Sequence, residues 1–444
     1  MSHAPAASSE HLPLDPSIRL RLSVMMFLQY FAWGAWFVTL GTYIGSNTGD
    51  GKIFAPGFIG RAYGSAAIAG MIAPFFVGMI ADRYFSTERI LAVLHLLGAG
   101  VLYYASTVQS QTVFYGTLIT FFLCYMPTLA LTNSLSFHHL TDPGRQFPGI
   151  RVLGTLGWIV AGNLVGYIQT LDGKYSLVVR EFMGIPLGGS AEVVPGMTGI
   201  EGTSVPMVIA AASQVLLALF CLVLPHTPPS NPTGQVTVRA ILGIDALQLM
   251  KRWPFAVFVV GSFLIAIPLQ FYYNYTNFFL NKVDVPNAAA KMSYGQMSEV
   301  VFMLLMPLFF ARLGVKKMLL FGMLAWAVRY VLFAFGRPET SMWMLYGGIL
   351  LHGICYDFFF VTGQIYVDRE ADNKIRGAAQ GFIAFVTLGL GSFIGAEFSG
   401  LMQQRFAQGD SVDWQPFWLV PAAFAGVVMV LFAVLFNDKP QAEK

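Results

Sequence analysis

The chain has 444 residues, of which 56% are hydrophobic and only 11% are charged, whereas roughly 25% of the residues in an ordinary soluble chain are charged. This composition excludes a water-soluble fold. The net charge of +3, from 26 Lys and Arg against 23 Asp and Glu, is too small and too scattered to indicate a nucleic-acid partner. We therefore predict a protein whose surroundings are the lipid bilayer.

The first part of the chain contains six apolar stretches of about twenty residues, the length that an α-helix needs to cross a bilayer. They cover approximately residues 20–45, 57–81, 90–107, 112–137, 148–170 and 205–224. The first stretch is too long and too aromatic for a signal peptide, so we expect it to remain as a helix. Residues 1–19 are predicted to form a cytoplasmic tail.

A polar segment, residues 225–253, opens with several prolines and is predicted to be a cytoplasmic linker. Six more apolar stretches then cover approximately residues 254–280, 292–312, 318–336, 340–367, 377–402 and 415–436. The sequence therefore predicts an all-α membrane protein with twelve transmembrane helices in two six-helix halves. These halves are residues 20–224 and 254–437, and residues 438–444 are a second predicted tail.

The basic residues set the expected orientation. With the N-terminus inside, the predicted cytoplasmic loops hold about twice as many Lys and Arg residues as the opposite loops, as the positive-inside rule requires. Both termini are therefore predicted to be cytoplasmic.

The loop after the second stretch contains Gly78, Asp82 and Arg83. An acid and an arginine between packed helices can hold a bundle closed by ion pairing, so these residues are a candidate conformational latch. The corresponding loop of the second half carries Lys316 and Lys317, which supports two related halves. The alternative is that such charges only set the topology.

Charged side chains at membrane depth cost about 2.5 to 3.5 kcal/mol each, so their presence needs a reason. Asp357 stands out because apolar and aromatic residues surround it. We expect its carboxyl group to face a cavity, where desolvation favours the neutral acid and suits a proton-coupling site. The alternative is a structural acid paired permanently with an arginine. Arg329 and Glu397 also lie in apolar stretches, and the sequence assigns neither of them a partner.

Two stretches carry polar groups on one helical face. Gln296 and Glu299 are three residues apart and are expected to face the same cavity as Asp357, although they could be a helix-packing pair. A second face combines a cation, a hydroxyl group and an indole at helical spacing, in Arg151, Thr155 and Trp158. The alternative is that Arg151 only reaches the membrane surface and that Trp158 is packing.

The stretch 254–280 is unusually polar on one side, where Gln270, Tyr273, Asn274 and Asn277 recur at spacings of three and four. Several amides in one membrane span are costly unless they line water or a ligand, which is what we expect here. His95 and His352 are lone histidines in apolar stretches, and we interpret them as core groups rather than proton relays.

The chain contains none of the motifs typical of nucleotide hydrolysis, zinc proteases or serine hydrolases. Cys124, Cys221 and Cys355 lie in apolar stretches without CxxC spacing and are interpreted as buried thiols. We therefore predict no enzyme activity, no cofactor and no metal site. Secondary transport requires none of these.

Two six-helix halves, a cytoplasmic linker and the Gly78 to Arg83 loop resemble the major facilitator superfamily, although Phe85 stands where a glycine is usual. More closely, the chain resembles the bacterial nucleoside:proton symporter family along its whole length. The residues that carry this resemblance are Phe27-Leu28-Gln29, Trp33-Gly34, Thr39-Leu40-Gly41, Tyr125-Met126-Pro127-Thr128-Leu129, Asn133, Arg151, Gly154-Thr155, Gly157, Leu269-Gln270, Gln296, Ser298-Glu299, Asp357-Phe358-Phe359, Ala379-Gln380-Gly381 and Asp413-Trp414-Gln415.

The resemblance implies a central nucleoside site. The residues that match positions expected to contact the nucleoside or support its binding are Arg151, Thr155, Gln270, Gln296, Glu299 and Asp357. Trp158 and Tyr356 stand at aromatic positions of the family, and Tyr273 stands where an asparagine is expected. The chemistry agrees, because rings can stack on a nucleobase, amides can pair with its edge and carboxylates can accept ribose hydroxyls.

We therefore predict a secondary active transporter that imports nucleosides by proton symport through alternating access, with Asp357 and Glu299 as proton-coupling groups. It is expected to work as a monomer in the bacterial inner membrane. The alternative is a major facilitator carrier for another polyhydroxylated solute, such as a sugar or oligosaccharide. A membrane sensor or scaffold is a further possibility, which the polar faces on four helices argue against.

Overall fold

The computed structural model describes residues 14–76, 85–179, 181–182, 185–186, 196–229, 244–372, 375–409 and 411–437. The candidate latch residues Gly78, Asp82 and Arg83 lie outside the described residues, as do residues 230–243 of the predicted linker.

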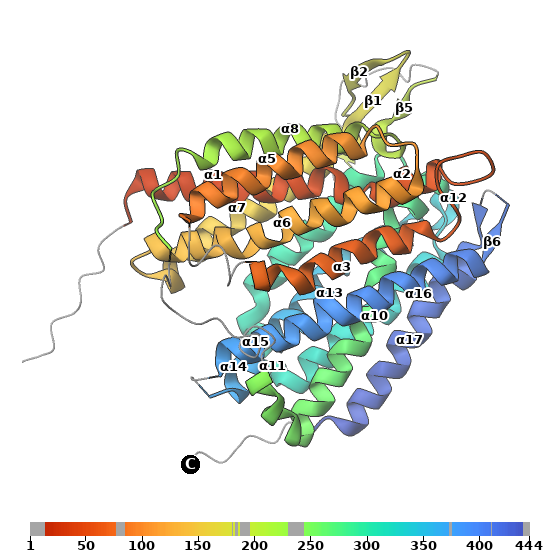
Figure 1. The fold of residues 1–444 in the computed structure, drawn as a ribbon. Helices are drawn as coiled ribbons and strands as arrows, with labels where there is room; N and C mark the ends of the chain where they lie inside the picture. The colour runs from red at the N-terminus through yellow and green to blue at the C-terminus, as the bar shows by residue number, and fades with distance from the viewer. Residues whose placement is uncertain are drawn as a thin grey trace, which may run out of the picture.

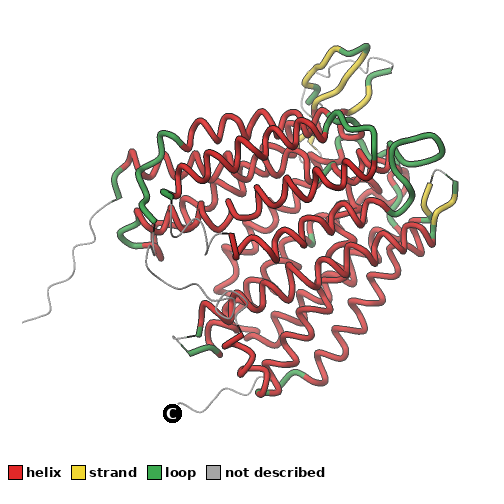
Figure 2. Tube along the Cα trace, viewed as in Figure 1, coloured by secondary structure: helices red, strands yellow, loops and turns green. Residues whose placement is uncertain are grey.

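Helices make up most of the described chain (Figure 1, Figure 2). The helices before residue 225, which we call the N-terminal helices, are α1 (Pro16–Phe37), α2 (Leu40–Ser46), α3 (Phe58–Phe76), α5 (Thr87–Ala105), α6 (Gln111–His139), α7 (Pro143–Tyr167) and α8 (Val205–Cys221). Prolines at the first or second position of α1, α7 and α8 help to fix where these helices begin, because proline suits the first turn and cannot continue a preceding helix.

The helices after residue 253, the C-terminal helices, follow a short 3-10 helix, η3 (Ile244–Lys251). They are α10 (Trp253–Lys282), α11 (Ala288–Phe335), α12 (Pro338–Leu350), α13 (His352–Tyr356), α14 (Thr362–Glu370), α15 (Arg376–Ala384), α16 (Ser392–Arg405) and α17 (Trp414–Leu435). Two π-helical segments interrupt this series, η4 (Asp357–Val361) between α13 and α14 and η5 (Phe385–Gly391) between α15 and α16. Such segments often mark functional positions.

Nine helical stretches in the described part of the chain are long and apolar enough to cross a membrane, and two shorter apolar helices accompany them, Phe58–Ala73 and Val205–Cys221. The predicted class of a helical membrane protein is thereby confirmed. The predicted stretches 292–312 and 318–336 are observed as two helices separated by a kink, and the label α11 covers both of them. They meet at Gly314, whose φ of 67° and ψ of 176° are not helical and are accessible to glycine at low cost.

Short strands gather at one end of the helix bundle (Figure 1, Figure 2). They include a sheet of order β2-β1-β5, in which β5 is Thr198–Gly199, and the hairpin of β6 (Ala407–Gln408) and β7 (Ser411–Val412). In the sheet, β1 (Ile168–Leu171) and β2 (Lys174–Leu177) are joined through Asp172 and Gly173, both at positive φ, which suits a tight hairpin. We call this the strand end; α1 begins and α17 ends at the opposite end.

The N-terminal and C-terminal helices contact one another through α7 with α11, α3 with α16 and α2 with α10. Glycines permit the close approach in each pair. A Cβ atom at Gly60 of α3 would overlap the carbonyl oxygen of Ala396, one at Gly166 of α7 would overlap the backbone of Ala290, and one at Gly41 of α2 would overlap the carbonyl oxygen of Asn274. Small residues at helix contacts are typical of membrane proteins.

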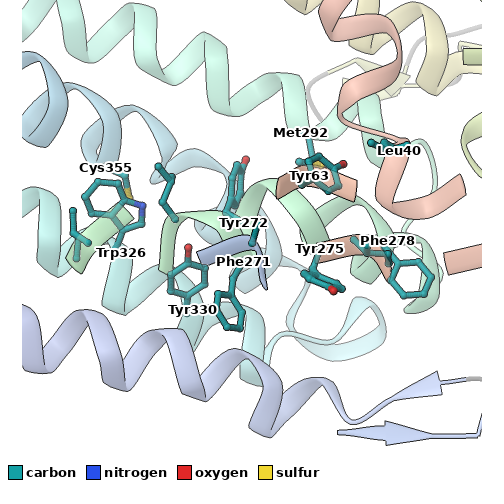
Figure 3. Close-up of a cluster of buried hydrophobic side chains, with 14 of the residues drawn as sticks. Leu40, Tyr63, Phe271, Tyr272, Tyr275, Phe278, Met292, Trp326, Tyr330 and Cys355 are labelled. Atoms are coloured by element: carbon teal, nitrogen blue, oxygen red, sulfur yellow. The ribbon is translucent and has the colours of Figure 1, made fainter. Parts of the chain in front are cut away.

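Aromatic side chains fill the interior of the C-terminal helices. Figure 3 shows Phe271, Tyr272 and Tyr275 along α10, with Trp326 and Tyr330 close by. The Tyr330 hydroxyl donates to the carbonyl oxygen of Pro268 at 2.5 Å. This packing fixes α10 against α11, the two helices that carry Gln270, Tyr273, Gln296 and Glu299 of the predicted site.

Candidate functional site

The stripe on α7 faces the protein interior beside α1. The Arg151 guanidinium lies 4.1 Å from the centre of the Tyr30 ring, a cation–π contact. The Trp158 ring stands edge-on to Trp33, with 5.4 Å between their centres. Because Gly34 has no side chain, α1 can approach Trp158 to near van der Waals contact. The third member, Thr155, is half-buried on the same helix.

A small cavity brings together predicted residues from three helices. Trp158 of α7, Tyr273 of α10 and Gln296 of α11 line it, together with Phe37 of α1 and Ser293 of α11. Its volume is about 20 Å³, enough for about one water molecule. The cavity therefore lies between the N-terminal and C-terminal helices, and it has both aromatic and hydrogen-bonding walls.

Glu299 lies one turn from Gln296 on α11, and it faces a histidine that sequence reasoning did not select for the site. The Nε2 atom of His352 is 3.8 Å from Glu299 Oε2. His352 had been interpreted as a core group. Its proximity to Glu299 arises from the packing of α13 on α11, which no spacing within either helix reveals.

Asp357 is completely buried at the start of η4. Neither of its carboxylate oxygens has a hydrogen-bond partner among the described residues, so the structure does not show the permanent arginine pair considered as an alternative. A buried carboxylate without a partner is costly, whereas the neutral acid is far less so. The neighbouring Tyr356 ring lies between His352 and Phe360, at 6.1 and 5.4 Å from their centres.

The polar face of α10 is used mainly for contacts within the protein. Gln270 Nε2 donates to Ser392 Oγ at 3.0 Å, and Asn274 Nδ2 donates to Ser399 Oγ at 3.0 Å. Asn277 Nδ2 donates to Glu201 Oε2 at 2.7 Å. The side-chain NH2 groups of Asn274 and Asn277 thus bond to Ser399 of α16 and to a loop acid, whereas Asn274 Oδ1 has no partner among the described residues. That these amides line water or a ligand stays a prediction. Tyr273 does line the cavity.

Glu201 is the residue that sequence reasoning missed most clearly. It lies in η2 (Ile200–Gly202) and is 3% exposed. Besides the bond from Asn277, its carboxylate accepts hydrogen bonds from Asn281 Nδ2 at 2.9 Å and from the backbone N–H of Ala289 at 3.1 Å. Burial raises the pKa of the Glu201 carboxyl above its ordinary value, and these donors partly offset that effect. Glu201 thus joins the loop before α8 to α10 and α11.

Other contacts between the N-terminal and C-terminal helices also lie towards the strand end. Thr42 Oγ1 donates to Asn277 Oδ1 at 2.5 Å, and Asn163 Nδ2 donates to Ser293 Oγ at 2.8 Å. Lys291 forms an ion pair with Glu181. The previously unassigned Glu397 lies 4.0 Å from Arg61.

Arg329, also unassigned from the sequence, is completely buried. Its Nε donates to the carbonyl oxygen of Gly348 at 2.9 Å, and its guanidinium lies 3.9 Å from the centre of the Tyr272 ring. Its two terminal nitrogens have no hydrogen-bond partner among the described residues. The interior of the C-terminal helices therefore contains a fixed positive charge close to the site.

The structure thus brings Trp158, Tyr273 and Gln296 to one cavity, whereas the other predicted site residues, Arg151, Thr155, Gln270, Glu299, Tyr356 and Asp357, do not line it. The predicted residues together offer rings, amides, a cation and two acids. This set can bind a small polar molecule with a flat ring and can also take up a proton. Among the residues that the structure describes, no group of three or more His, Cys, Asp or Glu side chains could hold a metal ion.

Comparison with known proteins gives a consistent result. The family model described as "Nucleoside H+ symporter" matches residues 16–441. The xanthosine permease of Escherichia coli is 33% identical over 96% of this chain and 98% of its own length. The nucleoside permease NupG of the same organism is 30% identical over 95% of this chain and 97% of its own. A third E. coli relative, YegT, is 39% identical over 94% of this chain and 93% of its own.

Solved structures agree with these sequence relationships. Crystal structures of NupG, one of them of a mutant, match with TM-scores of 0.82 and 0.79, and each match covers 95% of this chain and 100% of the NupG chain. A peptide transporter of the POT family is only 13% identical, yet it matches over 95% of this chain and 98% of its own with a TM-score of 0.67. That likeness concerns the fold alone. The resemblance predicted from the sequence is confirmed.

Proposed function

We propose that this chain, which belongs to the nucleoside H⁺ symporter family, imports nucleosides together with protons across a bacterial inner membrane. The observation that carries the proposal is the family match along residues 16–441. The cavity lined by Trp158, Tyr273 and Gln296 supports it, because these groups have the chemistry that a nucleoside needs.

In the proposed complex, the nucleobase stacks on Trp158 or Tyr273, since aromatic rings bind the flat face of any base. Gln296 pairs with the amide-like edge of the base, and Glu299 accepts hydrogen bonds from the ribose hydroxyls. Arg151, Thr155, Gln270, Tyr356 and Asp357 complete the proposed site. Gln270 supports the site without contacting the nucleoside directly, because its amide is hydrogen-bonded to Ser392. The cavity is too small for a nucleoside in this conformation, so the helices must separate to admit one.

Proton coupling is assigned to Asp357 and Glu299. Both are carboxyl groups inside the helix bundle, and their charges lie close enough to interact. Protonation removes a repulsion between them and changes the groups offered to the ribose. A proton and a nucleoside that each favour the same conformation then bind cooperatively, which is the thermodynamic basis of symport.

Alternating access is supported by the contacts between the N-terminal and C-terminal helices. Hydrogen bonds and glycine contacts hold them together towards the strand end, so the described conformation is the one closed at that end. We place both termini in the cytoplasm, which puts the strand end in the periplasm. Counting α3 and α8 as spans and dividing α11 at Gly314 gives twelve membrane helices in two halves.

The latch at Gly78, Asp82 and Arg83 and the monomeric state complete the proposal, on the grounds given by the sequence. The direct test of the function is uptake of labelled uridine or adenosine into proteoliposomes with an inward proton gradient. The proposal expects the gradient to drive accumulation, and unlabelled nucleosides but not hexoses to compete. A gradient without effect on nucleoside entry, or competition by hexoses alone, would exclude nucleoside symport.

A further inference from the structure

A series of buried groups leads from Glu299 into the C-terminal helices. His352 Nε2 is 3.8 Å from Glu299 Oε2, and the His352 ring stacks on Tyr272 with 5.2 Å between centres and 20° between planes. The Arg329 guanidinium lies on the same Tyr272 side chain at 3.9 Å. We call these four residues the Glu299–Arg329 series.

The backbone around this series is built for close packing. A Cβ atom at Gly295 of α11 would lie 3.0 Å from the Cβ of His352, and one at Gly353 of α13 would lie 2.6 Å from the backbone of Ser298. The Gly353 N–H also donates to Ser298 Oγ at 3.1 Å. α13 is thereby held against α11 at the turn that carries Glu299, so the position of His352 is fixed by backbone contacts and not by its own side chain.

The series also contains unused hydrogen-bonding capacity. Among the described residues, the Tyr272 hydroxyl, His352 Nδ1 and both terminal nitrogens of Arg329 lack a partner. Arg329 is completely buried and His352 is 3% exposed. Unpaired polar groups are costly inside a protein. Packing alone does not explain why several of them lie together beside a titratable acid.

Electrostatics supplies an explanation. The Arg329 guanidinium and the His352 ring both contact the Tyr272 side chain. A protonated His352 would therefore be repelled strongly by Arg329 where water is absent, so the fixed charge of Arg329 favours an uncharged imidazole at His352. A neutral imidazole can still donate one N–H. The same positive charge favours a negative charge at the other end of the series, on Glu299.

We propose that neutral His352, held by Tyr272 and Arg329, is a positioning residue that stabilises the deprotonated carboxylate of Glu299 while the empty transporter returns. The inference rests on the proposed symport. In each cycle the proton leaves the Glu299 carboxyl group for water after the nucleoside has been released. The imidazole keeps its own proton and donates Nε2–H to the carboxylate that remains, once the 3.8 Å between Nε2 and Glu299 Oε2 has shortened to hydrogen-bonding distance. Reprotonation of Glu299 from the other side ends that hydrogen bond, so no net proton stays on His352.

Other charged and titratable groups face Glu299 and take part in its titration. They are Arg151 of α7, Tyr272 and Tyr273 of α10, His352 and Tyr356 of α13, and Asp357 of η4. Arg151 is the cation on the opposite side, and it serves the substrate as well. His352 differs from Arg151 because it contacts the acid from the side of the C-terminal helices.

The inference distinguishes two transport modes. Net uptake driven by a proton gradient requires the empty transporter to return with Glu299 deprotonated, whereas exchange of labelled for unlabelled nucleoside does not. Loss of a hydrogen bond to a charged group costs about 1.5 to 3 kcal/mol, equivalent to about tenfold or more in an equilibrium. Removing the His352 donor should therefore slow net uptake much more than exchange.

The test uses the full chain in proteoliposomes and measures both modes over a range of pH. For His352→Phe, which keeps a ring but removes the donor, we expect net uptake to fall about tenfold and exchange to fall much less. His352→Gln, which keeps an N–H donor, should recover most of the net uptake. His95→Phe is the matched control, because His95 is a buried histidine that packs against Tyr125 in the N-terminal helices.

Equal losses of net uptake and exchange in His352→Phe would show a purely structural or substrate-binding role and overturn the inference. So would unchanged net uptake, or a His352→Gln variant as impaired as His352→Phe. If His352→Phe does not fold, His352→Gln and Arg329→Gln are compared instead. The inference requires Arg329→Gln to shift the pH dependence of net uptake. It also requires His352→Gln to leave that pH dependence near that of the wild type. If the wild type shows no proton-driven nucleoside uptake, the proposed function fails and not this inference alone.

Discussion

The carboxylate of Glu201 accepts a hydrogen bond of 2.7 Å from Asn277 Nδ2, and this contact ties the loop before α8 to the C-terminal part of α10. Asn277 in turn accepts a hydrogen bond from Thr42. The pair therefore lies at a point where α2, α10 and the loop before α8 converge at the strand end.

Glu201→Ala should weaken closure at the strand end. The change leaves the side-chain NH2 of Asn277 and the N–H of Ala289 without their acceptor, and unsatisfied buried groups cost about 1 to 3 kcal/mol each. With spin labels at the exposed positions Asp50 and Gln408, we expect a new population at longer distance. Glu339→Ala, at an exposed position of α12, is the control. A distance distribution identical to that of the wild type would contradict this role of Glu201.

Gly60→Ala should disturb the contact of α3 with α16. The new Cβ would overlap the Ala396 carbonyl oxygen and lie 2.8 Å from the Gly400 Cα, and neither backbone can yield easily. Overpacking of this kind costs about 1 to 3 kcal/mol, so the midpoint of thermal unfolding should fall. Gly116→Ala on α6 is matched to it, because a Cβ at Gly116 would meet no atom within 4 Å. Equal unfolding midpoints for the two variants would argue against the close contact.

Trp158→Ala should weaken nucleoside binding. Stacking of a base on an aromatic ring contributes about 1 to 3 kcal/mol, so KM for uridine uptake should rise by roughly ten- to a hundredfold. Trp343→Ala removes an equally large ring from α12, where it is 64% exposed, and should leave KM unchanged. If both variants raise KM equally, the effect comes from general destabilisation and Trp158 is not a binding residue.

Asp357→Asn should uncouple transport from the proton gradient. The amide resembles the neutral acid in size and cannot lose a proton, so uphill accumulation should disappear while exchange is at least partly retained. The measurement is the ratio of internal to external nucleoside at steady state under an imposed gradient. Asp284→Asn, in an exposed turn at the strand end, serves as the control. An unchanged accumulation ratio in Asp357→Asn would remove Asp357 from the coupling mechanism.

The sequence was sufficient to locate the membrane helices because apolar length is a local property. The predicted stretch 254–280, for example, is observed as α10, Trp253–Lys282. The predicted stretches 292–312 and 318–336 are likewise observed as two helices on either side of Gly314. Apolar length could not show that a single glycine with non-helical backbone angles makes the turn between them.

The site was only partly predictable for a related reason. Helical spacing correctly grouped Trp158, Tyr273 and Gln296 as polar or aromatic faces, and the structure brings them to one cavity. Spacing could not show that Asn277 faces Glu201 or that His352 faces Glu299, because those contacts join segments 76 and 53 residues apart in sequence. A buried acid in a Gly- and Pro-rich loop, such as Glu201, gives no periodic signal at all.

The hydrogen bonds at the strand end also bear on how fast the transporter can work. When that end opens, the protein partners of Glu201, Asn277 and Asn163 are replaced by water molecules. Each bond then costs only about 0.5 to 1.5 kcal/mol net, far less than the 4 to 6 kcal/mol of a bond broken without replacement. Several such hydrogen bonds can therefore close the transporter to ions and still separate in every cycle. An equally tight contact between apolar side chains would have to expose its whole area to water when it opens.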